Sequence, residues 1–171
     1  MRLFSIGILL SLSLLQGQQA RRAPGFALLD ANRHVQDLQD YRGKFVLLDF
    51  MKTDCPHCAA FAQVLDQART RYGTRIAVLS VVLPPDNMQT VTAFAEQYHL
   101  STTFLFDCGQ VAFSYFRPNG PSVTLPHLYI IDRDGMIVRD YAYSAGDESR
   151  FEAKSLFTEL DKLVGPPAQK L

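Results

Sequence analysis

The sequence predicts a single α/β domain whose central, mostly parallel sheet is covered by helices on both faces and ends in an antiparallel strand pair. Apolar runs of strand length alternate with segments whose apolar residues recur at helical spacing, which is typical of βαβ units. The dipeptide Asp134-Gly135 joins two later β-rich runs and is a strong hairpin signal. With 171 residues, one domain can bury its own core without a metal or a disulfide framework.

The first twenty residues are expected to be a signal peptide. Arg2 precedes an apolar run over residues 3–15, and a short polar stretch ends at Ala20. A membrane-spanning helix needs about 20 apolar residues, and this run is shorter. We therefore expect a domain over residues 21–171 that is periplasmic or secreted. An uncleaved anchor is the alternative, because Gln18 rather than a small residue lies two positions before Ala20.

The first half of the domain reads as two strands and a long helix. A short strand is expected at 26–29, with turns at 30–33 and 42–44, and a nearly continuous apolar run at 45–51 predicts a central strand covered on both faces. Pro56 suits the first position of a helix over 56–72, and Gly73 ends it.

The second half continues the alternation. The remaining elements are a strand at 76–83, the breaker Pro84-Pro85, a helix at 88–98, a strand at 103–106, a short helix at 110–116, and the hairpin centred on Asp134-Gly135. A final amphipathic helix is predicted over 148–163, ended by the prolines that follow Gly165.

Charge and cysteine content limit the possible functions. Lysine plus arginine and aspartate plus glutamate both number 17, so no basic face indicates nucleic acid or a membrane surface. The three cysteines, Cys55, Cys58 and Cys108, are too few for a disulfide-dense scaffold, and their odd number leaves one thiol over if Cys55 and Cys58 pair.

The stretch TDCPHCAAF carries the chemistry. Cys55 falls where a buried strand leads into a helix, and the unpaired N–H groups and dipole of a helix start favour a thiolate, lowering the pKa of a thiol from about 8.5. His57 adds a nearby positive charge when protonated, and Cys58, one turn further, is placed to resolve a mixed disulfide. An inert disulfide and a metal site remain alternatives, although zinc needs four ligands and only Cys55, Cys58 and His127 are candidates.

The segment LLDFMKTDCPHC resembles the active-site strand and motif of the thioredoxin-like superfamily. The preceding APGFALLDANRHVQDLQDYRGK is similar to the N-terminal extension of the TlpA and ResA type, which is related to the AhpC/TSA group, and TLPHLYIIDRDGMIV resembles a later family segment that contains a cis-proline. CPHC itself is the DsbA motif. The resemblance implies a thioredoxin-like fold with a central mixed sheet, flanking helices and an N-terminal extension.

The resemblance also implies residue roles. Cys55 would be the attacking thiol, Cys58 the resolving thiol, and Asp49 the buried acid that carries the proton of Cys58. A buried aspartate needs a reason, and the alternative is that Asp49 points outward or accepts a bond from a backbone donor. Pro56 and the pair Leu125 and cis-Pro126 would contact an extended substrate.

We therefore expect an exported thiol-disulfide oxidoreductase that needs no cofactor beyond the Cys55–Cys58 disulfide. Its partners would be exported proteins with thiols or disulfides and a recycling redox partner, either soluble or membrane-bound. CPHC favours an oxidant, whereas the ResA-type extension and the negative charge of Asp54 before Cys55 favour a reductant. The segment 116–123 is longer than the usual family connection and leaves room for a different substrate groove.

Two other functions are alternatives, a thiol peroxidase of the peroxiredoxin kind and a copper-binding chaperone of the Sco type, and the spacing around the cysteines argues against both. Peroxiredoxins place a threonine three residues before the reactive cysteine, and here that position is Lys52, with Thr53 only two residues away. Copper chaperones of the Sco type separate their cysteines by three residues rather than two.

Four further residues complete the set. Cys108, at the end of a strand, is expected to be a small buried filler rather than a third redox thiol, and His127 is expected at the rim of the site. His34 and His99 have no functional argument.

Overall fold

The computed structural model describes residues 21–116 and 123–167. Within them the chain forms a six-stranded mixed sheet in the order β1-β8-β7-β4-β5-β6, and a separate two-stranded ribbon of β2 and β3. The strands of the main sheet are β1 (Arg21–Arg22), β4 (Phe45–Met51), β5 (Ile76–Val82), β6 (Thr103–Phe106), β7 (His127–Ile131) and β8 (Met136–Ala142), and the ribbon is Ala27–Leu29 with Val35–Asp37. Strands β4, β5 and β6 are parallel, and β7 is antiparallel to both β4 and β8.

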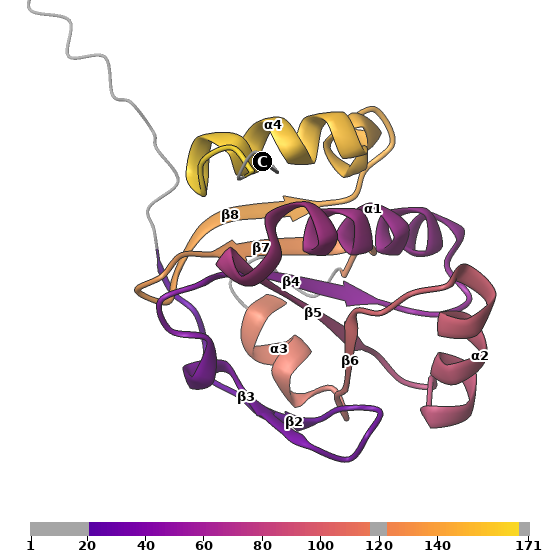
Figure 1. Cartoon of the computed structure of the whole chain (residues 1–171). Helices are drawn as coiled ribbons and strands as arrows, with labels where there is room; N and C mark the ends of the chain where they lie inside the picture. The colour runs from indigo at the N-terminus through magenta and orange to yellow at the C-terminus, as the bar shows by residue number, and fades with distance from the viewer. Residues whose placement is uncertain (1–20, 117–122, 168–171) are drawn as a thin grey trace, which may run out of the picture.

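Helices cover the sheet on both faces, as predicted. The α-helices are α1 (Pro56–Tyr72), α2 (Met88–Tyr98), α3 (Gln110–Phe116) and α4 (Ala153–Leu163). Figure 1 shows α1 and α4 on one side of the sheet, and α3 with the β2–β3 ribbon on the other. None of the helices in the described ranges is long and apolar enough to cross a membrane.

The alternation of side chains along β4 explains these layers. Val46, Leu48 and Phe50 point to the face covered by α3 and the N-terminal segment. Phe45 and Leu47 point to the face covered by α1 and α4. All seven residues of β4 are buried, as the continuous apolar run predicts. Asp49 is two residues after Leu47 in the same strand, so its side chain points to the same face as Phe45 and Leu47, the α1 side of the sheet.

Several predicted bounds agree with the structure, namely the strand at 45–51, the helix at 56–72 with Pro56 in its first turn, the helices at 88–98 and 110–116, and the strand at 103–106. The predicted antiparallel pair is β7 and β8, joined through Asp134-Gly135. It does not end the sheet, because the two-residue strand β1, which the sequence analysis missed, pairs with the outer side of β8. The ribbon strand β3 was also missed.

The prediction of one continuous final helix was wrong. A 3-10 turn over Glu148–Phe151 is followed by Glu152 in extended conformation, and only then does α4 begin. Phe151 and Leu156 are five residues apart, which a continuous helix would separate by about 140° around its axis. The break lets both side chains enter the same core cluster, where Phe151 packs edge-on against Phe61 with ring centroids 4.9 Å apart.

Two smaller bounds also differ: the ribbon strand begins at Ala27, after the buried Phe26, and β5 ends at Val82, before the cis bond of Pro84-Pro85. The predicted signal peptide and most of the segment 116–123 lie outside the described residues.

Candidate active site

Cys55 and Cys58 form a disulfide at the N-terminus of α1, with Cα atoms 5.2 Å apart. Cys55 is the N-cap residue, and the backbone N–H of Cys58 donates a hydrogen bond to Cys55 Sγ over 3.1 Å. The two sulfurs differ in access, because Cys55 is partly exposed whereas Cys58 is fully buried. A thiolate on Cys55 would therefore be both reachable and stabilised by the helix start.

Asp49 lies in the interior on the α1 side of the sheet and is fully buried. Neither of its carboxylate oxygens has a hydrogen-bond partner among the described residues, so the alternative of an outward or backbone-bonded Asp49 was wrong. Burial raises the pKa of Asp49 well above its usual range. Its register neighbour on β5 is Ser80, whose hydroxyl is also buried and unpaired within the described structure. Asp49 is thus a buried carboxyl whose protonated form is favoured by its surroundings.

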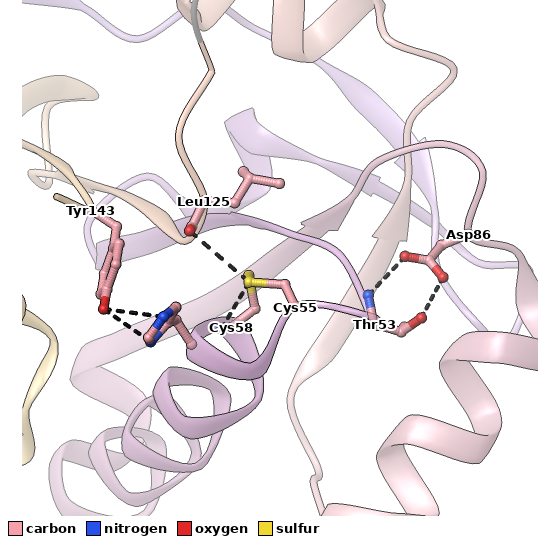
Figure 2. Close-up of a disulfide and its surroundings, with 7 residues drawn as sticks. Thr53, Cys55, Cys58, Asp86, Leu125 and Tyr143 are labelled. Carbon is pink, nitrogen blue, oxygen red and sulfur yellow. Dashed lines mark hydrogen bonds between the residues drawn. A yellow bond between two sulfur atoms is a disulfide. The ribbon is translucent and has the colours of Figure 1, made fainter. Parts of the chain in front are cut away.

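The Leu125–Pro126 peptide bond is cis, as the resemblance implies. Cys55 Sγ lies 4.0 Å from the carbonyl oxygen of Leu125 (Figure 2). The sulfur of a disulfide carries no hydrogen, so this is a contact, which a reduced Cys55 thiol could convert into a weak hydrogen bond. Leu125 is half-buried and Pro126 is buried, while Pro56 is exposed beside them.

Asp86 fixes the turn before Cys55 through hydrogen bonds to Thr53. The sequence patterns did not point to this residue. The Asp86 carboxylate accepts hydrogen bonds from the backbone N–H of Thr53 over 2.8 Å, from the Thr53 hydroxyl, and from the Thr90 hydroxyl over 2.8 Å. Figure 2 shows Thr53 and Asp86 on one side of the disulfide and Tyr143 on the other. Since the Thr53 hydroxyl is bound to Asp86, it does not face Cys55 as a peroxidatic threonine would.

His57 is exposed in the first turn of α1, and its ring is bound by Tyr143, which was also missed. The Tyr143 hydroxyl lies 2.9 Å from Nδ1 of His57, and the two rings stack with centroids 4.4 Å apart. No local pattern connects residues 57 and 143, so only the folded chain could reveal this pair.

Two expectations about single residues were wrong. His127 is buried rather than at the rim: its Nε2 lies 2.7 Å from Asp140 Oδ1, and its ring stacks on Tyr129. It shares the α3 face of the sheet with Tyr129, so it does not meet Cys58, which packs on the α1 side. Cys108 is exposed rather than buried, because it lies in the loop that follows β6.

The sequence-predicted residues therefore divide into two groups. The fold brings the Cys55–Cys58 disulfide next to Leu125 and the cis-Pro126 bond, with Cys55, Pro56 and His57 reaching the surface and Cys58, Pro126 and Asp49 buried. His127 and Cys108 lie elsewhere. Among the described residues, no group of three or more histidine, cysteine, aspartate or glutamate side chains could hold a metal ion.

Comparisons with known proteins agree with this geometry. The model of the AhpC/TSA family matches residues 20–140. Thioredoxin-like protein YneN of Bacillus subtilis is 30% identical over 122 residues, which cover 70% of this chain and 69% of YneN. Thiol-disulfide oxidoreductase ResA of Geobacillus kaustophilus is 29% identical over 115 residues, 67% of this chain and 64% of ResA.

A similar fold occurs among solved structures. A putative thiol:disulfide interchange protein DsbE from Chlorobium tepidum superposes with a TM-score of 0.66 at 26% identity, over 82% of this chain and 96% of that protein.

Proposed function

This chain belongs to the AhpC/TSA family and is a thiol-disulfide oxidoreductase of thioredoxin-like fold, and from that premise we propose that it exchanges disulfides with exported proteins through Cys55 and Cys58. One observation carries the assignment of roles. Cys55 caps a helix and is partly exposed, whereas Cys58 is fully buried behind it. Cys55 is therefore the sulfur that attacks or is attacked, and Cys58 is the sulfur that resolves.

In the reducing direction the Cys55 thiolate attacks a substrate disulfide. A bond forms between Cys55 and one substrate sulfur while the substrate S–S bond breaks, and the other substrate sulfur leaves as a thiolate that takes a proton from water. The substrate chain would lie along the Leu125 and Pro126 backbone beside Pro56, because these groups border Cys55 at the surface.

Cys58 then completes the exchange. The Asp49 carboxylate takes the proton of the Cys58 thiol, and the resulting thiolate attacks Cys55, so that the Cys55–Cys58 bond forms and the second substrate sulfur departs. The second substrate sulfur also leaves as a thiolate and takes a proton from water, and Asp49 releases the proton of Cys58 to the solvent. In sum the cysteine pair gives two electrons to the substrate, which takes up two protons from water. The same steps in reverse oxidise a dithiol, with protonated Asp49 returning its proton to Cys58. The disulfide itself carries the electrons, so no dissociable cofactor is required.

Export is part of the proposal and rests on the N-terminal signal-like segment, residues 1–20. An exported enzyme needs a second redox partner, soluble or membrane-bound, to restore its starting state, because the glutathione pool of the cytosol does not reach it. Substrates would be exported proteins with exposed thiols or disulfides.

Trapping the mixed disulfide tests the roles of the two cysteines. In Cys58→Ser the resolving thiol is absent, so we expect covalent complexes with a disulfide-containing substrate that disappear on reduction, as seen by non-reducing gels and intact mass. Cys55→Ser should trap none, and Cys108→Ser should behave as the parent protein. Complexes formed by Cys55→Ser but not by Cys58→Ser would reverse the assignment.

The reduction potential of the pair decides the direction. Purified protein is equilibrated in glutathione buffers, and its alkylated thiols are counted by mass. A potential near about −120 mV would make it a disulfide donor, and one near or below about −270 mV a reductant. The absence of any reversible two-electron couple would exclude thiol-disulfide exchange altogether.

A further inference from the structure

Tyr143 connects the two surface elements of the site. Its backbone N–H donates to the carbonyl oxygen of Pro126 over 3.2 Å, which ties it to the cis-proline segment. Its ring packs against Phe151 on one side, with centroids 5.5 Å apart, and stacks on His57 at 4.4 Å with an interplanar angle of 28°. A side chain held by the backbone and by two rings is a fixed partner for the imidazole of His57.

The imidazole of His57 is hydrogen-bonded to Tyr143 as well as stacked on it. The Tyr143 hydroxyl lies 2.9 Å from Nδ1 and 3.4 Å from Nε2 of His57, and the structure records no bond from this ring to another residue in the described ranges. His57 is exposed, so without Tyr143 its side chain would be free to turn about χ1 toward Cys55, two residues earlier at the helix start.

The surroundings of Tyr143 favour the same position of the ring. His57 and Tyr143 line a groove of 170 Å³ that is also lined by Phe151 and by two acidic residues, Glu148 and Glu152. A protonated imidazole in this groove is attracted by these two carboxylates, which compete with a thiolate on Cys55. Burial, and after it the charge and hydrogen bonding of Glu148, raise the pKa of Tyr143. A protonated imidazole donates from both of its nitrogens, so the Tyr143 hydroxyl oxygen accepts the hydrogen bond of His57 while its own proton points to Glu148.

A histidine between the two cysteines influences the couple through the thiolate. A protonated imidazole close to the Cys55 thiolate stabilises the reduced form, and a more stable reduced form makes the disulfide a stronger oxidant. An imidazole that is stacked on Tyr143 and hydrogen-bonded to it must give up both contacts before it can approach the sulfur.

We propose that Tyr143 is a positioning residue that holds His57 in this groove and so keeps the Cys55–Cys58 couple more reducing than a freely moving His57 would make it. This inference rests on the proposed disulfide exchange and adds the control of its direction. It also accounts for a CPHC motif, typical of oxidants, in a chain similar to ResA. His57 acts on the sulfur, and Tyr143 acts only through His57.

Tyr143→Phe is the sharpest test, because it keeps the stacked ring and removes the hydroxyl. We expect the equilibrium constant for reduction of the disulfide by glutathione to rise about fivefold, the size of effect that one lost hydrogen bond produces. At about 30 mV per tenfold change, this raises the reduction potential by about 20 mV. The readout is the reduced fraction of the variant and of the parent protein at fixed glutathione ratios, obtained by alkylation and mass.

A double-mutant cycle separates positioning from a structural role. In the His57→Ala background, Tyr143→Phe should leave the potential unchanged, because the residue through which Tyr143 acts is missing. Tyr141→Phe is the matched control: Tyr141 lies two residues earlier, within β8, and contacts Arg150 rather than His57, so it should not change the potential.

Three results would overturn the inference: an unchanged potential in Tyr143→Phe, a lower one, or an equal shift with and without His57. Each of these leaves the disulfide exchange intact, since a reversible couple is still measured. Loss of a reversible couple in the parent protein would instead contradict the proposed function. Imidazole signals of His57 in NMR spectra give a second readout, because they should change in Tyr143→Phe and stay in place in Tyr141→Phe.

Discussion

Asp49 places an ionisable group in a strand whose other six residues are apolar and buried. Both of its oxygens lack a partner among the described residues, and the neighbouring Ser80 hydroxyl does not compensate them. An unpaired polar group in an apolar interior costs free energy, so a strand selected for stability alone would carry leucine or valine at this position. The cost is consistent with a proton carrier behind the buried Cys58, because such a group must remain free of permanent bonds.

Asp49→Leu should stabilise the oxidised protein and make that gain depend on pH. Burial raises the pKa of Asp49 in the folded state, whereas in the unfolded chain it is about 3.9. Below that pH the carboxyl of Asp49 is protonated in both the folded and the unfolded chain, and the stability of the parent protein is highest. As the pH rises toward the folded pKa, the unfolded chain ionises first and the parent protein loses stability. We expect a gain in the free energy of unfolding of about 1–3 kcal/mol at pH 8 and a smaller one at pH 4.

Urea unfolding at pH 4, 6 and 8 measures this difference. Ser80→Ala is the matched control, because it removes a buried polar group that does not titrate in this range, so its effect should be the same at each pH. A gain for Asp49→Leu that does not vary with pH would mean that Asp49 ionises alike in the folded and unfolded chains.

At the scale of elements, the site depends on how two helix starts are joined. Asp86 precedes α2 and accepts hydrogen bonds from Thr53, in the turn before α1, and from Thr90, in the first turn of α2. Asn87 caps α2 separately, through bonds from the backbone N–H groups of Gln89 and Thr90. The turn that presents Cys55 is therefore fixed from outside its own helix, and α2 would keep its cap without Asp86.

Asp86→Ala should destabilise the protein and slow disulfide exchange. Hydrogen bonds to a charged group contribute about 1.5–3 kcal/mol, and their loss also frees the backbone N–H of Thr53 next to the active-site turn. Asn87→Ala is the control, since loss of an N-cap costs about 1 kcal/mol but leaves Thr53 bound. Unfolding curves and stopped-flow reduction of a disulfide substrate give both quantities. Equal slowing in the two variants would show that helix α2, rather than the Thr53 contact, controls the rate.

At the scale of the whole molecule, the two faces of the sheet serve different purposes. The face with α1 and α4 carries the disulfide and Asp49, and the opposite face is closed by α3 and the N-terminal segment (Figure 1). Two hydrogen bonds join that segment to Tyr115 of α3. The Arg21 side chain donates to the backbone oxygen of Tyr115 over 3.1 Å, and the Tyr115 hydroxyl donates to the backbone oxygen of Pro24 over 2.9 Å. The segment after the expected cleavage position thus belongs to the core.

Phe26→Ala should cost stability without changing the redox couple. Phe26 is 8% exposed and meets the Tyr115 ring edge-on, so truncation leaves a cavity worth about 3 kcal/mol on the face away from the cysteines. Leu29→Ala, at a side chain that is 50% exposed, should change the free energy of unfolding by less than about 0.5 kcal/mol. Chemical unfolding and glutathione equilibration measure the two properties. A shifted potential in Phe26→Ala would contradict the separation of the faces.

Local patterns were sufficient for the elements that they describe. The apolar run of β4, the proline that begins α1 and the Asp134-Gly135 turn each act through the backbone of a few neighbouring residues, so their bounds could be read from the chain. The cysteine pair follows in the same way, because a strand that leads directly into a helix fixes the helix turn on which each cysteine lies. The role of Asp49 came from the family resemblance, and its burial from the structure.

The sequence by itself therefore determined the fold class and the redox pair, and its resemblance to a family pointed to Asp49. Only the tertiary structure decided that Tyr143 binds His57, that Asp86 holds Thr53, that His127 is buried and that Cys108 is exposed. Partners 86 and 33 residues apart meet because strands and helices pack at distances and angles set by all their side chains together. No short stretch of sequence contains that information.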